Sequence, residues 1–130
     1  MKNRFPEKLF YSKDYSWVKV DGNDAWLGII DESAKQVEEF IFIMLPEVGK
    51  VLKKDDVYVS LEAVKWSGQL TTPLAGEVVE VNQALFDNPS QINQNPYDCW
   101  IAKIKLSNKD EIEELMSAAE AQKFYQEKFQ

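Results

Sequence analysis

Short segments in which apolar and polar residues alternate, each ended by turn residues, run along most of the chain. Alternation with a period of two is typical of strands that bury one face. We interpret six segments as strands: residues 17–20, 25–30, 40–45, 57–64, 76–81 and 100–106. The first two form a hairpin around a glycine-containing turn, and residues 40–45 are so apolar that we expect a buried strand. The pattern predicts a mainly β fold.

Two helices are expected beside the strands. Asp31 or Ser33 is suited to cap a short helix after the first hairpin, with Ala34, Val37 and Phe40 on one side. A second helix is predicted over about residues 108–125, because apolar residues recur there at helical spacing. Its expected cap is Ser107 or Asn108, and its apolar face is formed by Ile112, Leu115, Met116 and Ala119. We expect this helix to pack against the sheet, whereas the terminal aromatic residues Phe124, Tyr125 and Phe129 either dock or fray.

The remaining composition fits a single domain over residues 1–130. A chain of 130 residues with 45% hydrophobic and 12% aromatic content suits one compact core. Residues 82–96 are rich in Asn, Gln and Pro, and we interpret them as a long loop. Residues 1–15 resemble neither a signal peptide nor a transit peptide, and no segment is apolar enough for a membrane span.

Charge and residue inventory exclude several classes of function. The formal net charge of −7 argues against a nucleic-acid partner, because binding to phosphates needs a surplus of Lys and Arg. The chain has no histidine, so Ser-His and Cys-His catalytic sites are impossible. Cys99 is the single cysteine and can form no internal disulfide, which favours a reducing, intracellular compartment. Partners are therefore expected to be proteins or small molecules.

Lys65 is the residue that we select as a candidate site. It lies between two strand-like segments, with Gly49 sixteen residues before it and Gly76 eleven after it, and the next strand is expected from about Leu70. A lone lysine at a turn is ordinarily a solvated charge. A covalent swinging-arm carrier, however, requires a protruding lysine on a stiff backbone, with glycines where the strands bend tightly.

An ordered series of motifs makes the interpretation more specific. The chain resembles the H protein of the glycine cleavage system, a relative of the lipoyl and biotinyl domains, over roughly residues 10–124. The matching segments are residues 11–14 with Trp17, 27–29, 45–49, 62–65, 76–82, 84–85, 87–89, 92–93, 96–97, Trp100 and 104–105. Biotinyl domains place methionines beside the lysine, whereas Val64 and Trp66 stand here, so lipoate is favoured over biotin.

The resemblance implies both a fold and a role. The implied fold is a flattened barrel-sandwich hybrid of the lipoyl/biotinyl, hammerhead kind. Lipoic acid is implied as an amide on Lys65, with Glu62 and Val64 as the recognition context. The partners implied are the glycine decarboxylase (P protein), the aminomethyltransferase (T protein), the dihydrolipoyl dehydrogenase (L protein) and a lipoate ligase or lipoyl transferase. The protein would be a monomeric carrier without catalytic activity, in the bacterial cytoplasm or the mitochondrial matrix.

Several positions depart from the family pattern. Tyr15 and Ser16 replace a histidine and a glutamate, Gln69 an aspartate, and Trp66 a small residue. Asp55 replaces a turn glycine, and the turn before Trp100 is shortened to Asp98-Cys99. We hypothesise that the scaffold and lipoylation are retained, while protection of the aminomethyl group is weakened or replaced. The alternative interpretation is that these departures have no functional meaning: Ser16 is a neutral surface change, Trp66 a surface aromatic and Cys99 a small buried hydrophobe.

Two other functions remain open at this point. One is an H-like protein that donates lipoyl groups or serves another lipoate-dependent pathway, such as sulfur oxidation, and it also needs Lys65. The other is an unmodified binding module that uses Trp66 and the C-terminal aromatic residues as its interaction surface.

Overall fold

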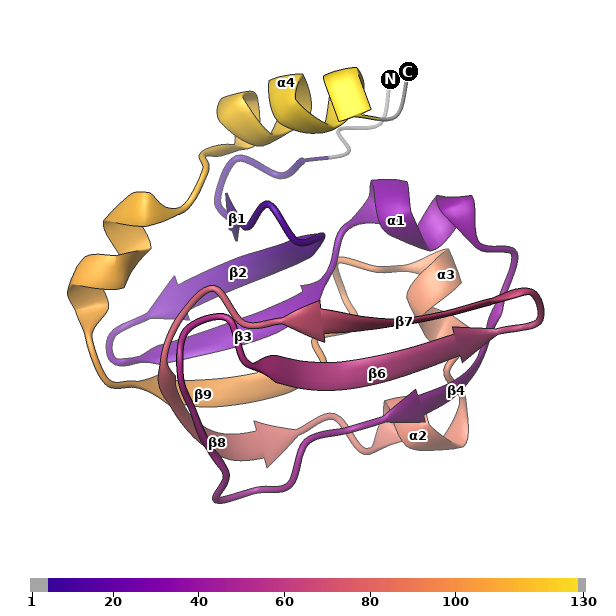
Figure 1. Ribbon diagram of the computed structural model, residues 1–130, viewed down its shortest axis with the longest axis horizontal. Helices are drawn as coiled ribbons and strands as arrows, with labels where there is room; N and C mark the ends of the chain where they lie inside the picture. Colours follow the sequence, from indigo (N-terminus) through magenta and orange to yellow (C-terminus); the bar gives the residue numbers. More distant parts are fainter. Residues whose placement is uncertain (1–4, 129–130) are drawn as a thin grey trace.

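A computed structural model of the protein describes residues 5–128. Two antiparallel sheets make up most of this part of the chain (Figure 1). The larger has the strand order β1 (Phe10–Tyr11), β2 (Ser16–Asp21), β3 (Asp24–Ile29), β9 (Ala102–Leu106), β8 (Gly76–Val81) and β5 (Val51–Leu52). The smaller has the order β4 (Phe40–Met44), β6 (Val57–Ala63) and β7 (Trp66–Thr71). The mainly β architecture predicted from the alternating pattern is confirmed.

The main core lies where the two sheets face each other. Val18 and Leu27 from the larger sheet and Ile43 and Leu61 from the smaller one belong to the same buried cluster. Figure 1 shows the β6–β7 hairpin crossing in front of β3 and β9. From Val59 to Ala63, buried side chains alternate with more exposed ones along β6, as a strand with one buried face requires.

Three short α-helices lie between strands of the described chain, and a 3₁₀ helix follows the last strand, β9. They are α1 (Asp31–Gln36), α2 (Ala84–Asp87), α3 (Gln91–Gln94) and η1 (Lys109–Glu114). Residues 82–96 are thus not a structureless loop, since α2 and α3 lie within them and bury Leu85 and Ile92. The first helix is confirmed, but Ile30 is its N-cap rather than Asp31 or Ser33. Asp31 instead lies inside the first turn and pairs with Lys35 at 3.1 Å.

The C-terminal segment contains two helices, where one was predicted. Asn108 does cap the first, η1, by accepting a hydrogen bond from the Asp110 amide at 3.0 Å. The chain is then extended at Leu115, and Met116 exchanges two backbone hydrogen bonds of 2.9 Å with Tyr11. This bridge interrupts the helical spacing, and α4 begins only at Ala118 and runs to Lys128.

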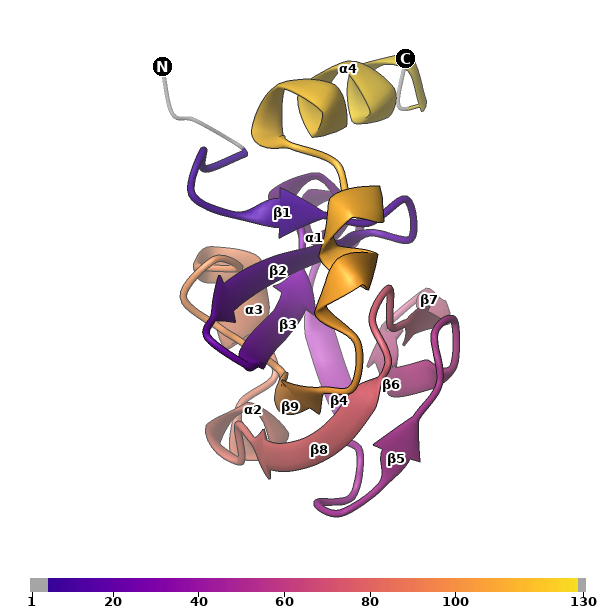
Figure 2. The same cartoon turned by 90° about the vertical axis from the view of Figure 1, so that its left-hand side faces the viewer.

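Helix α4 covers a second apolar cluster. The cluster contains Tyr11, Trp17, Ile30, Met116 and Tyr125, all of them buried. Figure 2 shows α4 with β1 at one end of the molecule, and α2 with β8 at the other. Tyr125 therefore docks, whereas Phe129 lies outside the described residues.

Strand β4 is only partly buried, so the prediction of a buried strand over residues 40–45 was wrong. Phe40 and Ile43 are buried, but Ile41, Phe42 and Met44 are exposed. The reason is position: β4 is an edge strand, and a register shift between Phe40 and Phe42 breaks the alternation against β6. The local sequence therefore overstates how much of this segment reaches the core.

Candidate functional site

Lys65 lies at the tip of the β6–β7 hairpin. Ala63 and Trp66 form the last paired positions, so Val64 and Lys65 alone make the turn. The second strand begins at Trp66 rather than near Leu70, which makes the lysine turn tighter than the sequence indicated. Lys65 is exposed, and no ion pair engages it among residues 5–128. Its amine is therefore open to a modifying enzyme.

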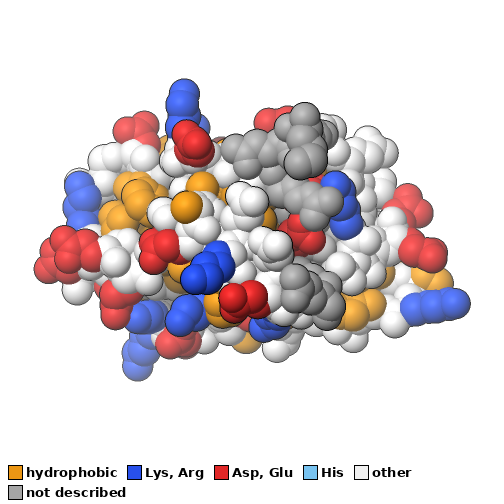
Figure 3. Space-filling model, turned by 90° about the horizontal axis from the view of Figure 1, so that it is seen from above, with side chains coloured by type: hydrophobic (Ala, Val, Ile, Leu, Met, Phe, Trp, Pro, Cys, Tyr) orange, Lys and Arg blue, Asp and Glu red, His pale blue; other side chains and the backbone are white. Residues whose placement is uncertain are grey.

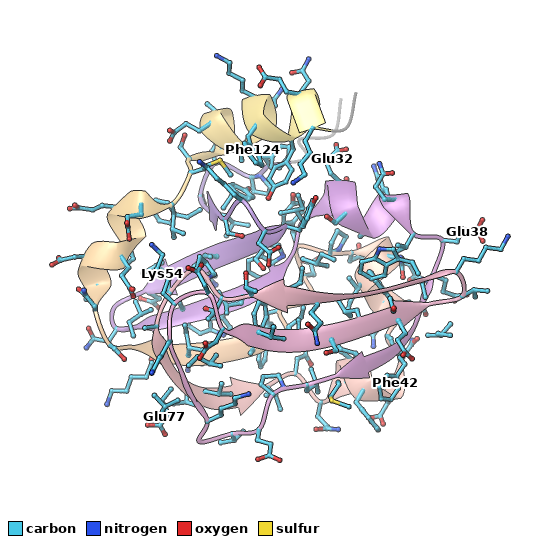
Figure 4. All side chains as sticks on the ribbon, viewed as in Figure 1. Glu32, Glu38, Phe42, Lys54, Glu77 and Phe124 are labelled. Atoms are coloured by element: carbon cyan, nitrogen blue, oxygen red, sulfur yellow. The ribbon has the colours of Figure 1, made fainter. Side chains whose placement is uncertain are left out.

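A groove of about 590 Å³ lies beside this lysine. Four parts of the chain line it: the turn before β2, Ile29 at the end of β3, helix α1 with the residues that follow it, and the β6–β7 hairpin. Residues from these parts include Asp14 and Tyr15, then Gln36 and Glu38, then Lys65, Trp66 and Gln69. Figure 4 labels Glu38 near the tip of the hairpin.

The groove contains two carboxylates that the sequence analysis did not select. One Asp14 carboxylate oxygen accepts hydrogen bonds from the Thr71 hydroxyl at 2.6 Å and the Thr71 amide at 2.5 Å. This contact ties the turn before β2 to the end of β7. Glu38 is exposed and lines the groove from the segment that follows helix α1. Asp14 was visible only as part of the matching segment 11–14, and no local signal pointed to Glu38.

Ser16 does not lie in the groove. It is fully buried, and its hydroxyl shares a 2.8 Å hydrogen bond with the Tyr58 hydroxyl, which joins β2 to β6. The Ser16 amide donates to the Ser12 hydroxyl at 3.1 Å. Burial raises the pKa of Tyr58 far above its usual range, so this phenol stays neutral. The interpretation of Ser16 as a neutral surface change is therefore wrong.

The other departing positions have distinct surroundings. Gln69 lines the groove and its side-chain amide donates to the Ser60 hydroxyl at 3.4 Å. Asp55 has a φ of 74°, the left-handed conformation that glycine adopts more readily than other residues. Cys99 is buried, as expected of a small hydrophobic residue. The pKa of its thiol is raised, mainly by burial and to a smaller extent by the negative charge of the nearby Asp98.

Glu62 and Val64 lie close to Lys65 in the chain, but only Val64 lines the groove. Glu62 is exposed on β6 and lies opposite Ser67. Val64 lines the groove and is 70% exposed at the turn. Both side chains are accessible beside Lys65, and their role in recognition stays a prediction.

Two other kinds of feature are absent from the described part of the chain: metal-binding clusters and membrane-spanning helices. Within residues 5–128, no group of three or more His, Cys, Asp or Glu side chains is placed to hold a metal ion. No helix in that part of the chain has the length and apolarity needed to cross a membrane. Figure 3, which looks down on the face that carries α4, shows acidic and basic side chains interspersed.

Comparison with known proteins gives a consistent result. The sequence profile described as "Glycine cleavage H-protein" matches residues 9–128. The glycine cleavage system H protein of Thermoanaerobacter sp. (strain X514) is 43% identical over 121 residues, covering 93% of this chain and 96% of that protein. A protein of Thermococcus gammatolerans, named as a probable glycine cleavage system H protein, is 46% identical over 114 residues, covering 86% and 85%.

A solved structure agrees at the level of the fold. The crystal structure of a glycine cleavage system H protein from Mycobacterium marinum superposes with a TM-score of 0.83 at 24% identity, covering 93% of this chain and 98% of that one. The barrel-sandwich hybrid expected from the resemblance is thus confirmed. The matches also favour a role in glycine cleavage over a lipoyl donor or a carrier in another lipoate-dependent pathway. The chain belongs to the glycine cleavage H-protein family.

Proposed function

We propose that this protein is the lipoyl carrier of a glycine cleavage system, and that Lys65 carries lipoic acid as an amide. The observation that carries the residue assignment is the position of Lys65, exposed at a two-residue turn and next to a groove of about 590 Å³. An amide on its Nζ needs a primary amine that a ligase can reach. The paired strands on both sides hold the backbone of that turn in one conformation.

The chemistry of transfer would come from the cofactor and the partner enzymes. When attached, the lipoyl group supplies a disulfide that is reduced as it takes up an aminomethyl unit. This chain contributes attachment, presentation and shielding. Asp14 and Glu38 place negative charge in the groove, which favours a cationic group there over a neutral or anionic one. The groove therefore contains carboxylates even though Ser16 and Gln69 provide none.

The proposed partners follow from membership of the system. They are the P protein, the T protein, the L protein and a lipoate ligase or lipoyl transferase, which would recognise Glu62 and Val64 around the lysine. Amide formation removes one positive charge, and the formal net charge changes from −7 to −8. An acidic carrier of this size is suited to brief, electrostatically guided encounters with several enzymes.

The experiment measures the intact mass of the protein purified from its native cell, together with its glycine-dependent reduction by the P protein. We expect a lipoyl adduct that maps to Lys65 and disappears in Lys65→Arg. Lys53→Arg, at another exposed turn, is the matched control and keeps the adduct. An unmodified Lys65 in native protein contradicts the carrier function. A lipoylated protein that the P protein cannot reduce with glycine contradicts the pathway but leaves the attachment site standing.

A further inference from the structure

Trp66 occupies an unusual place next to the attachment lysine. It follows Lys65 directly in the chain, and its side chain lines the groove. The indole lies over Gly68, where an added Cβ would come within 2.5 Å of the ring atom Cζ2. The Phe40 ring meets it edge-on, with centroids 6.0 Å apart and planes at 66°. Despite these contacts the side chain is 42% exposed.

This packing holds a large aromatic surface in a fixed position. Gly68 provides the space under the ring, and Phe40 supports its edge, so the orientation of the indole does not depend on a ligand. The exposed part of the ring belongs to the groove wall, together with the apolar side chains of Val37, Ala63 and Leu70. The groove thus combines a carboxylate-bearing part with an aromatic, apolar part.

We propose that Trp66 is a specificity-determining residue that receives the dithiolane end of the lipoyl arm. The proposal rests on the proposed attachment at Lys65. A neutral ring with two sulfur atoms matches an aromatic, apolar wall, because sulfur atoms make favourable contacts with aromatic rings. Attachment at the neighbouring residue raises the effective concentration of the arm at this surface without any further binding energy. The resting arm is then shielded, and it leaves the groove to meet a partner enzyme.

The first test measures how fast a phosphine reductant opens the disulfide of the lipoylated protein. Removing the indole in Trp66→Ala is expected to speed reduction by roughly twofold to tenfold, the range that a sulfur–aromatic contact corresponds to. Trp66→Phe keeps an aromatic ring, and its reduction rate is expected to lie between the rates of the unsubstituted protein and of Trp66→Ala. Phe42→Ala is the matched control, because Phe42 is also an exposed aromatic, at 38%, but lies outside the groove. Each variant is first shown by intact mass to carry the lipoyl group.

The second test follows the indole Nε1–H resonance of Trp66, assigned through Trp66→Phe, before and after lipoylation. We expect this resonance to shift on lipoylation and again on reduction, with the Trp26 resonance unchanged. An unmoved Trp66 resonance together with wild-type reduction of Trp66→Ala overturns the proposal, while the adduct on Lys65 keeps the carrier function intact. Failure of Lys65 to accept a lipoyl group overturns both.

Discussion

Gly76 shows how a single residue limits the approach of two strands. A Cβ at this position would clash with the backbone carbonyl oxygen of Lys105 on the neighbouring strand β9. Because a backbone atom cannot rotate away, Gly76→Ala is expected to lower the free energy of unfolding by about 1–3 kcal/mol, as overpacking typically does. Urea denaturation measures the loss. The next residue, Glu77, is exposed (Figure 4), and Glu77→Ala is the control; equal stability of the two variants would contradict the steric argument.

The buried pair Ser16 and Tyr58 allows a second prediction for single residues. Each hydroxyl satisfies the other at 2.8 Å between the two sheets. Ser16→Ala or Tyr58→Phe leaves one buried hydroxyl without this partner and is expected to cost about 1–3 kcal/mol. The double variant removes both polar groups, and its loss should be smaller than the sum of the single losses. A double-mutant cycle in urea tests this, and strictly additive losses would show that the two hydroxyls are not coupled.

At the scale of elements, helix α4 positions one wall of the groove. The Tyr125 hydroxyl donates to the Ser12 carbonyl at 2.5 Å and accepts from the Tyr15 amide at 2.8 Å. Tyr15 has a φ of 66°, an uncommon conformation that needs support from its surroundings. The helix thus fixes the turn that carries Asp14 into the groove, across more than a hundred residues of sequence.

Tyr125→Phe tests this role of the helix. The Tyr15 amide loses its acceptor, so its hydrogen exchange is expected to become at least about tenfold faster, which corresponds to about 1.4 kcal/mol. Amide exchange by NMR gives the rate for each residue. Lys123→Ala, an exposed change on the same helix, should leave the Tyr15 rate unchanged. Unchanged exchange in Tyr125→Phe would mean that the turn is held by other contacts.

The elements also show where sequence reasoning succeeds. The strand before Lys65 could be predicted because β6 has one mainly buried and one mainly exposed face, which the alternation records. The strand after Lys65 was expected only from about Leu70, although β7 begins at Trp66. The break at Leu115 could not be predicted, because it depends on the backbone bridge between Met116 and Tyr11, two residues far apart in the chain. The exposed side chains of β4 were missed for the same reason, since edge position is a property of the sheet and not of the segment.

For the whole molecule, the attachment residue could be inferred from sequence but the groove could not. Lys65 lies within a local motif, whereas the groove exists only once Ile29 and residues 14–15, 33–38 and 63–70 are brought together. The hydrogen bonds from Thr71 to Asp14 connect positions 57 apart in the sequence. Absence of a carboxylate at Ser16 and Gln69 therefore did not mean absence of carboxylates from the site.

Four tyrosines that are wholly or partly buried make the stability of the whole protein sensitive to high pH. Burial raises the pKa of Tyr11, Tyr58, Tyr97 and Tyr125 well above the ordinary value of 10.0. Above pH 10 the unfolded chain releases these protons and the folded chain retains them, so deprotonation stabilises the unfolded state. The stabilising contribution is complete below pH 10 and is lost as the pH rises toward the folded-state pKa values. In this window each such tyrosine lowers the free energy of unfolding by up to about 1.4 kcal/mol per pH unit.

We therefore expect the urea midpoint to decline slightly near pH 9, where the Cys99 thiol of the unfolded chain ionises, and to fall steeply above about pH 10, where the tyrosines do. Tyrosinate absorbance should report the same event, with the buried tyrosines ionising only as the protein unfolds. Tyr58→Phe with Ser16→Ala removes one of the four groups and should reduce the slope by about a quarter, because the remaining three still titrate. Full ionisation of all tyrosines in the folded state near pH 10, with an unchanged urea midpoint, would contradict the link between burial and stability.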